Sequence, residues 1–233
     1  RVELTADGAH LLSYARRLLR LNDEALGSLD RGARTGKVRV GVTDTSMIYV
    51  SHILRAFAER CPLVQVEMTC GRSWEALADL DEGKIDLALV TQPCGHEGGR
   101  LLWREPLVWV AAERGVAMRQ GPLPLAVSPA PCVYRKRATD ALDAAGRPWR
   151  IAYTCGALTG THAAVRAGLG VTVLPKDMVP ADLVMLDEEA GLPGLADTEM
   201  ALLVAADIGP PAQRLREYVI RELERGRGEG TTG

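Results

Sequence analysis

The amino-acid sequence predicts an α/β fold of two lobes, which are connected by two crossover strands and preceded by one long helix. Strand and helix patterns alternate over residues 37–91 and again over residues 123–174. This alternation is typical of parallel sheets, because each helix returns the chain to the starting edge of the next strand. Two extended segments, 106–112 and 199–205, lie outside both series and are predicted to carry the chain into the second lobe and back.

The first element is predicted to be an amphipathic helix in residues 5–31. Leucine and alanine recur there at positions that share one face of a helix. Thr5 can cap the first turn, since its hydroxyl accepts a hydrogen bond from a backbone N–H that has no helical partner. Gly32 and Gly36 end the pattern. Because such a stripe at a chain end is most simply buried against a second copy, this helix is predicted to mediate dimerisation.

The remaining elements follow in chain order. The first lobe is predicted to contain strands at 37–42, 63–69 and 85–91, helices at 49–60 and 74–82, and a final helix at 211–225. The second lobe is predicted to contain strands at 123–128, 149–154 and 170–174 and helices at 134–145 and 158–167. The resulting domains are a linker helix (1–35), the first part of lobe one (36–108), lobe two (109–204), the return to lobe one (205–226) and a disordered tail (227–233).

Composition excludes several classes of protein. Among 233 residues, 28 Lys and Arg stand against 30 Asp and Glu, so the basic excess of a nucleic-acid-binding surface is missing. Apolar runs are far shorter than the roughly 20 residues that span a bilayer, and we expect no membrane contact. The five cysteines show no close pairing, which fits a reducing cytoplasm. The four histidines are scattered, so neither a metal site nor a cofactor is predicted.

Motifs of catalysis are missing from the sequence. It contains no Gly-x-Ser-x-Gly elbow, no phosphate loop that ends in Gly-Lys-Ser/Thr, and no Gly-x-Gly-x-x-Gly after the first strand. Asp44 and Cys155 are the only plausible acid, base or nucleophile near the predicted strand ends. No catalytic site is predicted, and the chain is not expected to be an enzyme.

Short polar segments recur where the predicted strands end. In an open parallel sheet, ligands bind outside the carboxyl ends of the strands, where the following helices present free N–H groups. The arrangement predicts a site for a small anionic or polar ligand. Thr45 and Ser73 also fit a simpler role as helix N-caps, and the two roles are compatible. The residues at these ends are Thr45, Ser46, Ser73, Thr91, Ser128 and Thr154.

Four cysteines and one tryptophan allow two interpretations each. Cys70, Cys94, Cys132 and Cys155 fall at or just beyond predicted strand ends. Thiols in half-exposed, electropositive places can act as redox or electrophile sensors, whereas cysteine also packs as a small apolar residue. Trp74 can fill the core or form the wall of a pocket.

Five segments resemble LysR-type transcriptional regulators, and together they cover essentially the whole chain. They are Leu4-Thr5-Ala6-Asp7-Gly8, Arg39-Val40-Gly41-Val42, Phe57-Ala58-Glu59-Arg60-Cys61-Pro62, the segment 80–90 (LDEGKIDLALV) and the segment 165–175 (VRAGLGVTVLP). Residues 107–111 and 148–150 resemble the branch of that family that contains LrhA, HexA and PecT.

The resemblance implies a periplasmic-binding-protein-like (type 2) fold whose lobes close on a small-molecule effector. It implies a homodimer or homotetramer, formed through the linker helix and the lobes. It also implies that DNA is bound only through an upstream winged helix-turn-helix, which is missing here. Family pocket positions map onto Thr45, Ser46, Ser73, Thr91, Val127, Ser128, Tyr134 and Thr154.

Members of the family that bind aromatic carboxylates often have a positive side chain where Thr91 stands. The threonine therefore disfavours a benzoate-like effector, unless Arg72 or Arg135 supplies the charge. Two alternatives share the predicted architecture. One is a periplasmic-type solute-binding protein, and the other is an enzyme such as a prephenate dehydratase or a deaminase.

Overall fold

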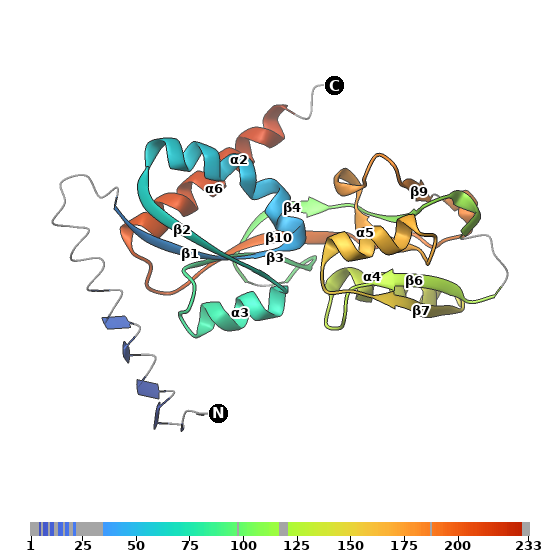
Figure 1. The fold of residues 1–233 in the computed structure, drawn as a ribbon, viewed down its shortest axis with the longest axis horizontal. Coiled ribbons are helices and arrows are strands. Elements are labelled where there is room, and N and C mark those ends of the chain that lie inside the picture. Colours follow the sequence, from blue (N-terminus) through green and yellow to red (C-terminus); the bar gives the residue numbers. More distant parts are fainter. Residues whose placement is uncertain are drawn as a thin grey trace. The chain divides into compact units, whose positions relative to one another are not determined.

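The structure, a computed structural model, describes residues 35–96, 98–116, 121–186 and 188–229 (Figure 1). Of the N-terminal segment it describes residues 5, 7, 8, 10, 11, 14, 15, 17, 18 and 21. The described chain divides into two compact units. Unit 1 comprises the described parts of Arg1–Val90, Gly98–Leu102 and Ala201–Gly233, and unit 2 those of Thr91–Glu97 and Trp103–Met200.

The passages between the units lie a few residues earlier than expected. Besides Thr91–Glu97, unit 2 comprises the described residues from Trp103 to Met200, where residues 109–204 were expected. The reason is that strand β5 (Leu107–Ala111), which was predicted to be the crossover, pairs with two strands of unit 2. The preceding strand β4 (Arg100–Glu105), which was not predicted, spans the passage instead.

A sheet with the strand order β2-β1-β3-β10-β4 forms the framework of unit 1. Strands β1, β2, β3 and β10 are Thr35–Thr43, Leu63–Gly71, Leu87–Pro93 and Thr198–Val204. β1 pairs in parallel with both β2 and β3, which confirms the predicted parallel βαβ units. β3 is buried over most of its length, as its apolar run indicated.

Three helices cover this sheet: α2 (Asp44–Arg60), α3 (Ser73–Asp81) and α6 (Pro210–Glu229). α2 and α6 lie together on one face, and α3 lies on the other (Figure 1). Phe57 of α2 meets Tyr218 of α6 edge to face, with their ring centroids 5.5 Å apart. Ala76 and Leu80 of α3 pack with Ile85 in a small core on the opposite face.

The last helix is longer than predicted. α6 extends to Glu229, so residues 227–229, which were predicted to lie in a disordered tail, are helical; residues 230–233 lie outside the described chain. The physical reason is that a helix, once started, gains a hydrogen bond for each residue added, and this gain carries it through Gly226 and Gly228.

Unit 2 contains two smaller sheets. The strands β6 (Leu123–Val127) and β7 (Trp149–Thr154) pair in parallel. β5 pairs antiparallel with β8 (Thr172–Pro175) and β9 (Val184–Leu186). A parallel bridge between Leu125 and Val171 joins the two sheets. The helices of the unit are α4 (Val133–Ala144) and α5 (Leu158–Arg166), and short 3₁₀ turns occur at Arg114–Val116, Lys176–Met178 and Glu188–Ala190.

Trp109 belongs to the larger core of unit 2. It belongs to one buried cluster with Leu125 of β6 and Leu142 of α4. Its indole N–H donates to the carbonyl oxygen of Pro193 at 2.8 Å. The tryptophan therefore buries its ring without leaving its polar atom unsatisfied.

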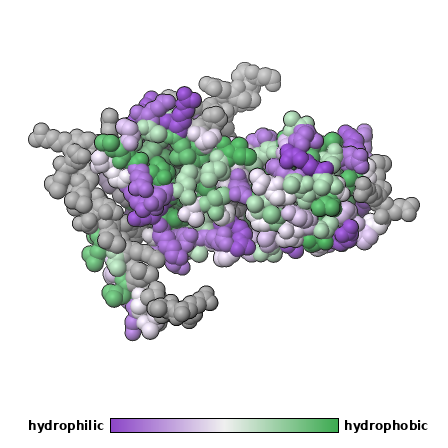
Figure 2. Space-filling view, viewed as in Figure 1, coloured by the Kyte–Doolittle hydropathy of each residue, from purple (hydrophilic) through white to green (hydrophobic). Residues whose placement is uncertain are grey.

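The described residues of the N-terminal segment are helical from Asp7 onward. The backbone N–H of Gly8 donates to the hydroxyl of Thr5 at 3.1 Å, which confirms the predicted N-cap. Four large side chains on this segment are 53–69% exposed: Leu11, Tyr14, Leu18 and Leu21. Figure 2 shows some green, hydrophobic surface on the described part of this segment. Within the described residues, no helix is both long and apolar enough to cross a membrane.

Candidate functional site

The first turn of α2 contains a capping box that was not predicted. Thr43 precedes the helix, and its hydroxyl accepts from the backbone N–H of Ser46 at 3.2 Å. The hydroxyl of Ser46 accepts in return from the backbone N–H of Thr43 at 2.8 Å. The N-cap is therefore Thr43, and the prediction that Thr45 has this role is wrong.

Thr45 and Ser46 differ in what they offer a ligand. The Ser46 hydroxyl is fully buried and lies 3.0 Å from the carbonyl oxygen of Thr43 and 3.4 Å from that of Leu89. The Ser46 hydroxyl holds the start of α2 against β3. Because Ser46 has no exposed surface, a ligand cannot contact its side chain in this conformation. Thr45 is 6% exposed, and its hydroxyl lies 3.0 Å from that of Thr43.

At the start of α3, Arg72 rather than Ser73 precedes the helix. The Glu75 carboxylate accepts from the backbone N–H of Arg72 at 2.8 Å and from its guanidinium at 2.6 and 3.1 Å. These hydrogen bonds lower the pKa of Glu75 and raise the pKa of Arg72. Arg72 also lies over the Trp74 ring, 4.8 Å from its centroid. The guanidinium charge of Arg72 therefore already interacts with side chains of unit 1.

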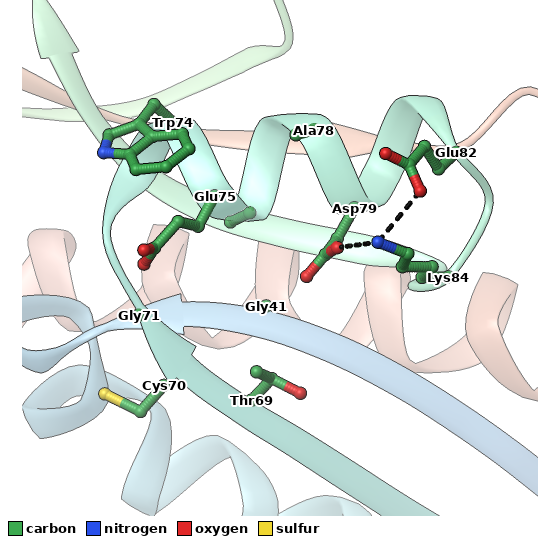
Figure 3. A pocket seen from close by; sticks show the side chains of 11 residues that line it. Gly41, Thr69, Cys70, Gly71, Trp74, Glu75, Ala78, Asp79, Glu82 and Lys84 are labelled. Carbon is green, nitrogen blue, oxygen red and sulfur yellow. Dashed lines mark ion pairs between the residues drawn. The ribbon is translucent and has the colours of Figure 1, made fainter. Parts of the chain in front are cut away.

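A cavity of about 360 Å³ opens between α3 and strands β1 and β2 (Figure 3). Trp74, Glu75 and Cys70 line one end. At the other end, Lys84 pairs with Asp79 at 3.0 Å and with Glu82 at 2.8 Å, and these contacts raise its pKa. Trp74 thus forms a pocket wall, one of the two roles that its sequence position allowed. Each carboxylate at this cavity has a cationic partner.

In unit 2, the structure brings two predicted site residues into contact. The hydroxyl oxygens of Thr91 in β3 and Tyr134 in α4 lie 3.2 Å apart. Tyr134 donates to Oε2 of Glu105 at 3.0 Å, and the Thr198 hydroxyl donates to the same oxygen at 3.2 Å. Sequence reasoning missed both Glu105 and Thr198, although they complete the chain of hydrogen bonds.

Glu105 is an acid buried in the interior, since only 1% of it is exposed. Burial raises its pKa above the ordinary value, whereas hydrogen bonds from Tyr134, Thr198 and Trp103 oppose that shift. These donors stabilise the ionised form, which the interior otherwise disfavours. The negative charge of Asp177 acts in the same direction as burial.

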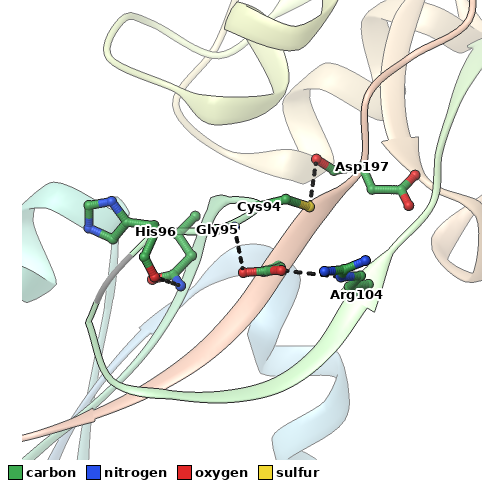
Figure 4. A network of polar contacts seen from close by, with 7 residues as sticks. Cys94, Gly95, His96, Arg104 and Asp197 are labelled. Carbon is green, nitrogen blue, oxygen red and sulfur yellow. Dashed lines mark hydrogen bonds and ion pairs between the residues drawn. The ribbon is translucent and has the colours of Figure 1, made fainter.

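A second polar network holds the segment that follows β3 (Figure 4). The Cys94 thiol donates to the carbonyl oxygen of Asp197 at 3.3 Å. The Gly95 N–H donates to Oε2 of Glu199, and the Arg104 guanidinium donates to Oε1 of the same carboxylate, both at 3.3 Å. Glu199 therefore ties the segment to β4 and β10 from a buried position.

The carboxyl ends of β6 and β7 bring the remaining predicted residues together. Val127 and Thr154 are direct partners in the parallel register. Val127 is buried, whereas Thr154 is exposed. The guanidinium of Arg135 donates to the carbonyl oxygen of Ser128 at 3.4 Å, which places a cation beside this edge.

The cysteines have different surroundings. The Cys70 thiol donates to Asp44 at 2.9 Å, and burial together with this carboxylate raises the pKa of Cys70 to about 11. Burial and the charge of Glu199 raise the pKa of Cys94. Since the thiolate is the reactive form, both groups are disfavoured as sensors at neutral pH. Cys132 and Cys155 are half-exposed, and Tyr153 is hydrogen-bonded to Cys155.

Residues 31–224 match the family described as "LysR substrate binding domain". The chain belongs to this family. Among curated relatives, it is 35% identical over 195 residues to the HTH-type transcriptional regulator DgdR of Burkholderia cepacia, covering 83% of this chain and 66% of DgdR. It is 36% identical over 200 residues to the regulator PecT of Dickeya dadantii, covering 85% of this chain and 63% of PecT. The LysR-family chain thus spans about two thirds of these relatives' length.

Solved structures of LysR-family proteins support the same fold. The CcmR regulatory domain of Synechocystis PCC6803 in complex with 2-PG has a TM-score of 0.65 at 15% identity, covering 81% of this chain and 97% of that one. The effector-binding domain of QuiR in complex with shikimate also has a TM-score of 0.65 at 15% identity, covering 82% and 98%. The predicted periplasmic-binding-protein-like fold of type 2 is confirmed.

Proposed function

We propose that this chain is the effector-sensing and oligomerisation part of a cytoplasmic LysR-type transcriptional regulator. In this proposal it binds a small molecule, and DNA is bound by another part of the protein. The observation that carries the proposal is the family match over residues 31–224, together with polar strand ends in each unit. Binding can shift such a regulator only if the effector has different affinities for two conformational states.

A thermal-shift screen against metabolites tests effector binding. A ligand at 100 times its dissociation constant adds about 2.7 kcal/mol to the free energy of unfolding. We expect Thr45→Val combined with Ser73→Val to abolish this stabilisation, because both side chains lie at the starts of helices in unit 1. The oligomer should persist in this double variant.

The matched control for this variant is Thr139→Val. The Thr139 hydroxyl bonds to carbonyl oxygens of its own helix, at Arg135 and Lys136, away from the strand ends. An effector that stabilises the Thr45/Ser73 variant as strongly as the wild type would refute the assignment of these residues to the binding site.

The exposed apolar side chains of the N-terminal helix support the proposal of oligomerisation. Leu11, Tyr14, Leu18 and Leu21 follow the alternating spacing of three and four residues that forms a helix-pairing seam. We expect Leu18→Glu to weaken self-association by at least about tenfold, because two buried carboxylates would face each other in the pair. Sedimentation velocity at several concentrations measures this change.

The control is Arg17→Ala, on the same helix. Arg17 pairs with Asp207 at 3.5 Å, and both side chains are highly exposed. Such an exposed ion pair contributes little to the stability of the protein. If Leu18→Glu sediments like the wild type, the helix does not mediate self-association. Whether the assembly is a dimer or a tetramer follows from the mass of the wild type in the same experiment.

A thiol sensor is the second candidate function. One relative, 32% identical over 198 residues, is named a probable hydrogen peroxide-inducible genes activator, from Mycobacterium avium. The raised pKa values of Cys70 and Cys94 leave Cys132 and Cys155 as the favoured thiols. Running the thermal-shift screen with and without oxidant separates the two functions, since only a thiol sensor responds to oxidant alone.

The alternatives of a solute-binding protein and an enzyme receive less support. The relatives DgdR and PecT are named transcriptional regulators. Asp44 is one of the two candidate catalytic groups. It lies in the first turn of α2 and accepts a hydrogen bond from the Cys70 thiol. Turnover of any effector found in the screen would favour an enzyme.

A further inference from the structure

Another cavity of unit 1, of about 280 Å³, lies between α6, the end of β10 and the start of β4. All of its lining residues belong to the segments Gly98–Leu102 and Ala201–Gly233, which are parts of this unit. Its volume is close to the lower limit of about 300 Å³ for sites that bind small molecules. The cavity can therefore hold a small ligand without any contribution from unit 2.

This cavity lies at the opposite end of the sheet from Thr45 and Ser73, which follow the carboxyl ends of β1 and β2. The backbone N–H of Ala205, directly after β10, donates at 3.0 Å to the carbonyl oxygen of Asp86, directly before β3. Because β1, β2 and β3 run in parallel, the start of β3 is far from their carboxyl ends. The cavity is thus separate from the effector site predicted for unit 1.

The wall of the cavity is apolar. Leu202, Leu203 and Val204, the last three residues of β10, line it together with Ile220 of α6. Gly99 closes one side, where a Cβ atom would lie 2.8 Å from the carbonyl oxygen of Leu202, and its φ of +72° also favours glycine. A hydrocarbon chain bound against this wall is removed from water, which favours binding.

Two arginines give the cavity its charge. Arg216 lies four residues before Ile220 on α6, so both share one face of the helix. Arg100 lines the cavity from the first position of β4. Both arginines are exposed, and no acidic residue is among the described residues that line the cavity. Arg100 has another interaction of its own, whereas Arg216 forms no ion pair or hydrogen bond with the described residues.

We propose that this cavity binds a small organic anion with an apolar chain, as a medium-chain fatty acid has, and that Arg216 binds its carboxylate. A guanidinium can donate two parallel hydrogen bonds to a carboxylate, which an organic cation cannot accept. The apolar chain packs against β10 and Ile220, and for this reason acetate, which lacks the chain, binds poorly. The site is additional to the effector site of the proposed function and does not depend on it.

Sodium octanoate and octylammonium chloride test the proposal, because they share a chain and carry opposite charges. Each is titrated at pH 7 and low salt, since salt screens exposed charges, into the full chain labelled with ¹³C at the isoleucine δ1 methyl groups. Ile220→Val assigns the Ile220 signal, and Ile151 of β7 in unit 2 is the internal control. We expect octanoate to shift Ile220, but not Ile151, saturably and at a concentration at least about tenfold lower than octylammonium.

Arg216→Glu is the decisive variant, and its exposed position favours normal folding. We expect octanoate to need at least about tenfold higher concentration for the same Ile220 shift, and the preference over octylammonium to disappear. Arg216→Lys should keep the preference for octanoate, because the positive charge remains. Lys136→Glu makes the same change of charge on α4 of unit 2, at a residue that pairs with Asp140, and should leave both titrations unchanged at Ile220.

Three outcomes would overturn the proposal. If octylammonium shifts Ile220 at an equal or lower concentration, the cavity does not select anions. If octanoate shifts Ile151 as strongly as Ile220, or shifts neither, this cavity is not its site. If Arg216→Glu responds to octanoate like the wild type, Arg216 does not bind the carboxylate. None of these results affects the proposed function, which the thermal-shift screen tests separately.

Discussion

Trp109→Ala is expected to lower the free energy of unfolding of unit 2 by about 4 kcal/mol. The ring is 3% exposed and packs among Leu125 and Leu142, so its removal leaves a large cavity. The carbonyl oxygen of Pro193 also loses its indole donor. Urea titration followed by far-ultraviolet circular dichroism measures the loss without relying on tryptophan fluorescence.

Trp74→Ala is the control, because it makes the same substitution at a ring that is 44% exposed. Its main described contact is with the Arg72 guanidinium, so we expect a loss below about 1 kcal/mol. Equal losses in the two variants would contradict the placement of Trp109 in the core of unit 2. Trp109→Phe should have an intermediate effect, since it keeps most of the apolar burial.

Gly170→Ala is the second large expected effect, with a loss of about 3 kcal/mol in the free energy of unfolding. A Cβ atom at this position would lie 2.7 Å from the carbonyl oxygen of Pro124 and 3.2 Å from the backbone nitrogen of Ala126. These are main-chain atoms of β6, which cannot rotate away. The same atoms pair with Val171, so the bridge between the two sheets of unit 2 would be disrupted.

Gly156→Ala provides the comparison, because a Cβ atom there meets nothing within 4 Å. We expect its thermal unfolding midpoint to stay close to that of the wild type. An unchanged midpoint for Gly170→Ala would show that the approach of residue 170 to β6 is looser than the distances indicate.

The sequence predicted most elements because their periodicity is local. β7 was predicted with its observed bounds, Trp149–Thr154, since turn residues flank an apolar run. The start of α2 was placed five residues too late, at Tyr49 instead of Asp44. The signal was present in the Thr43 to Ser46 capping box, but the polar run Thr43-Asp44-Thr45-Ser46 also fits a loop.

The candidate site was predicted in part, for a physical reason. Parallel strands end at one edge, so their polar ends identified Thr45 and Thr91. The role of Glu105 could not be predicted, because a lone glutamate in a sequence resembles a surface charge. Its burial depends on Thr198, 93 positions away, and on Tyr134, 29 positions away. Periodicity contains no information about such distant partners.

The division of the chain into units has a consequence for its synthesis. The ribosome completes all of unit 2 once Met200 has been added, whereas unit 1 still lacks most of β10 and all of α6. Until these residues emerge, the place between β3 and β4 is unfilled, and Phe57 has no Tyr218 to cover it. The nascent protein should therefore complete its second unit before β10 and α6 close its first unit.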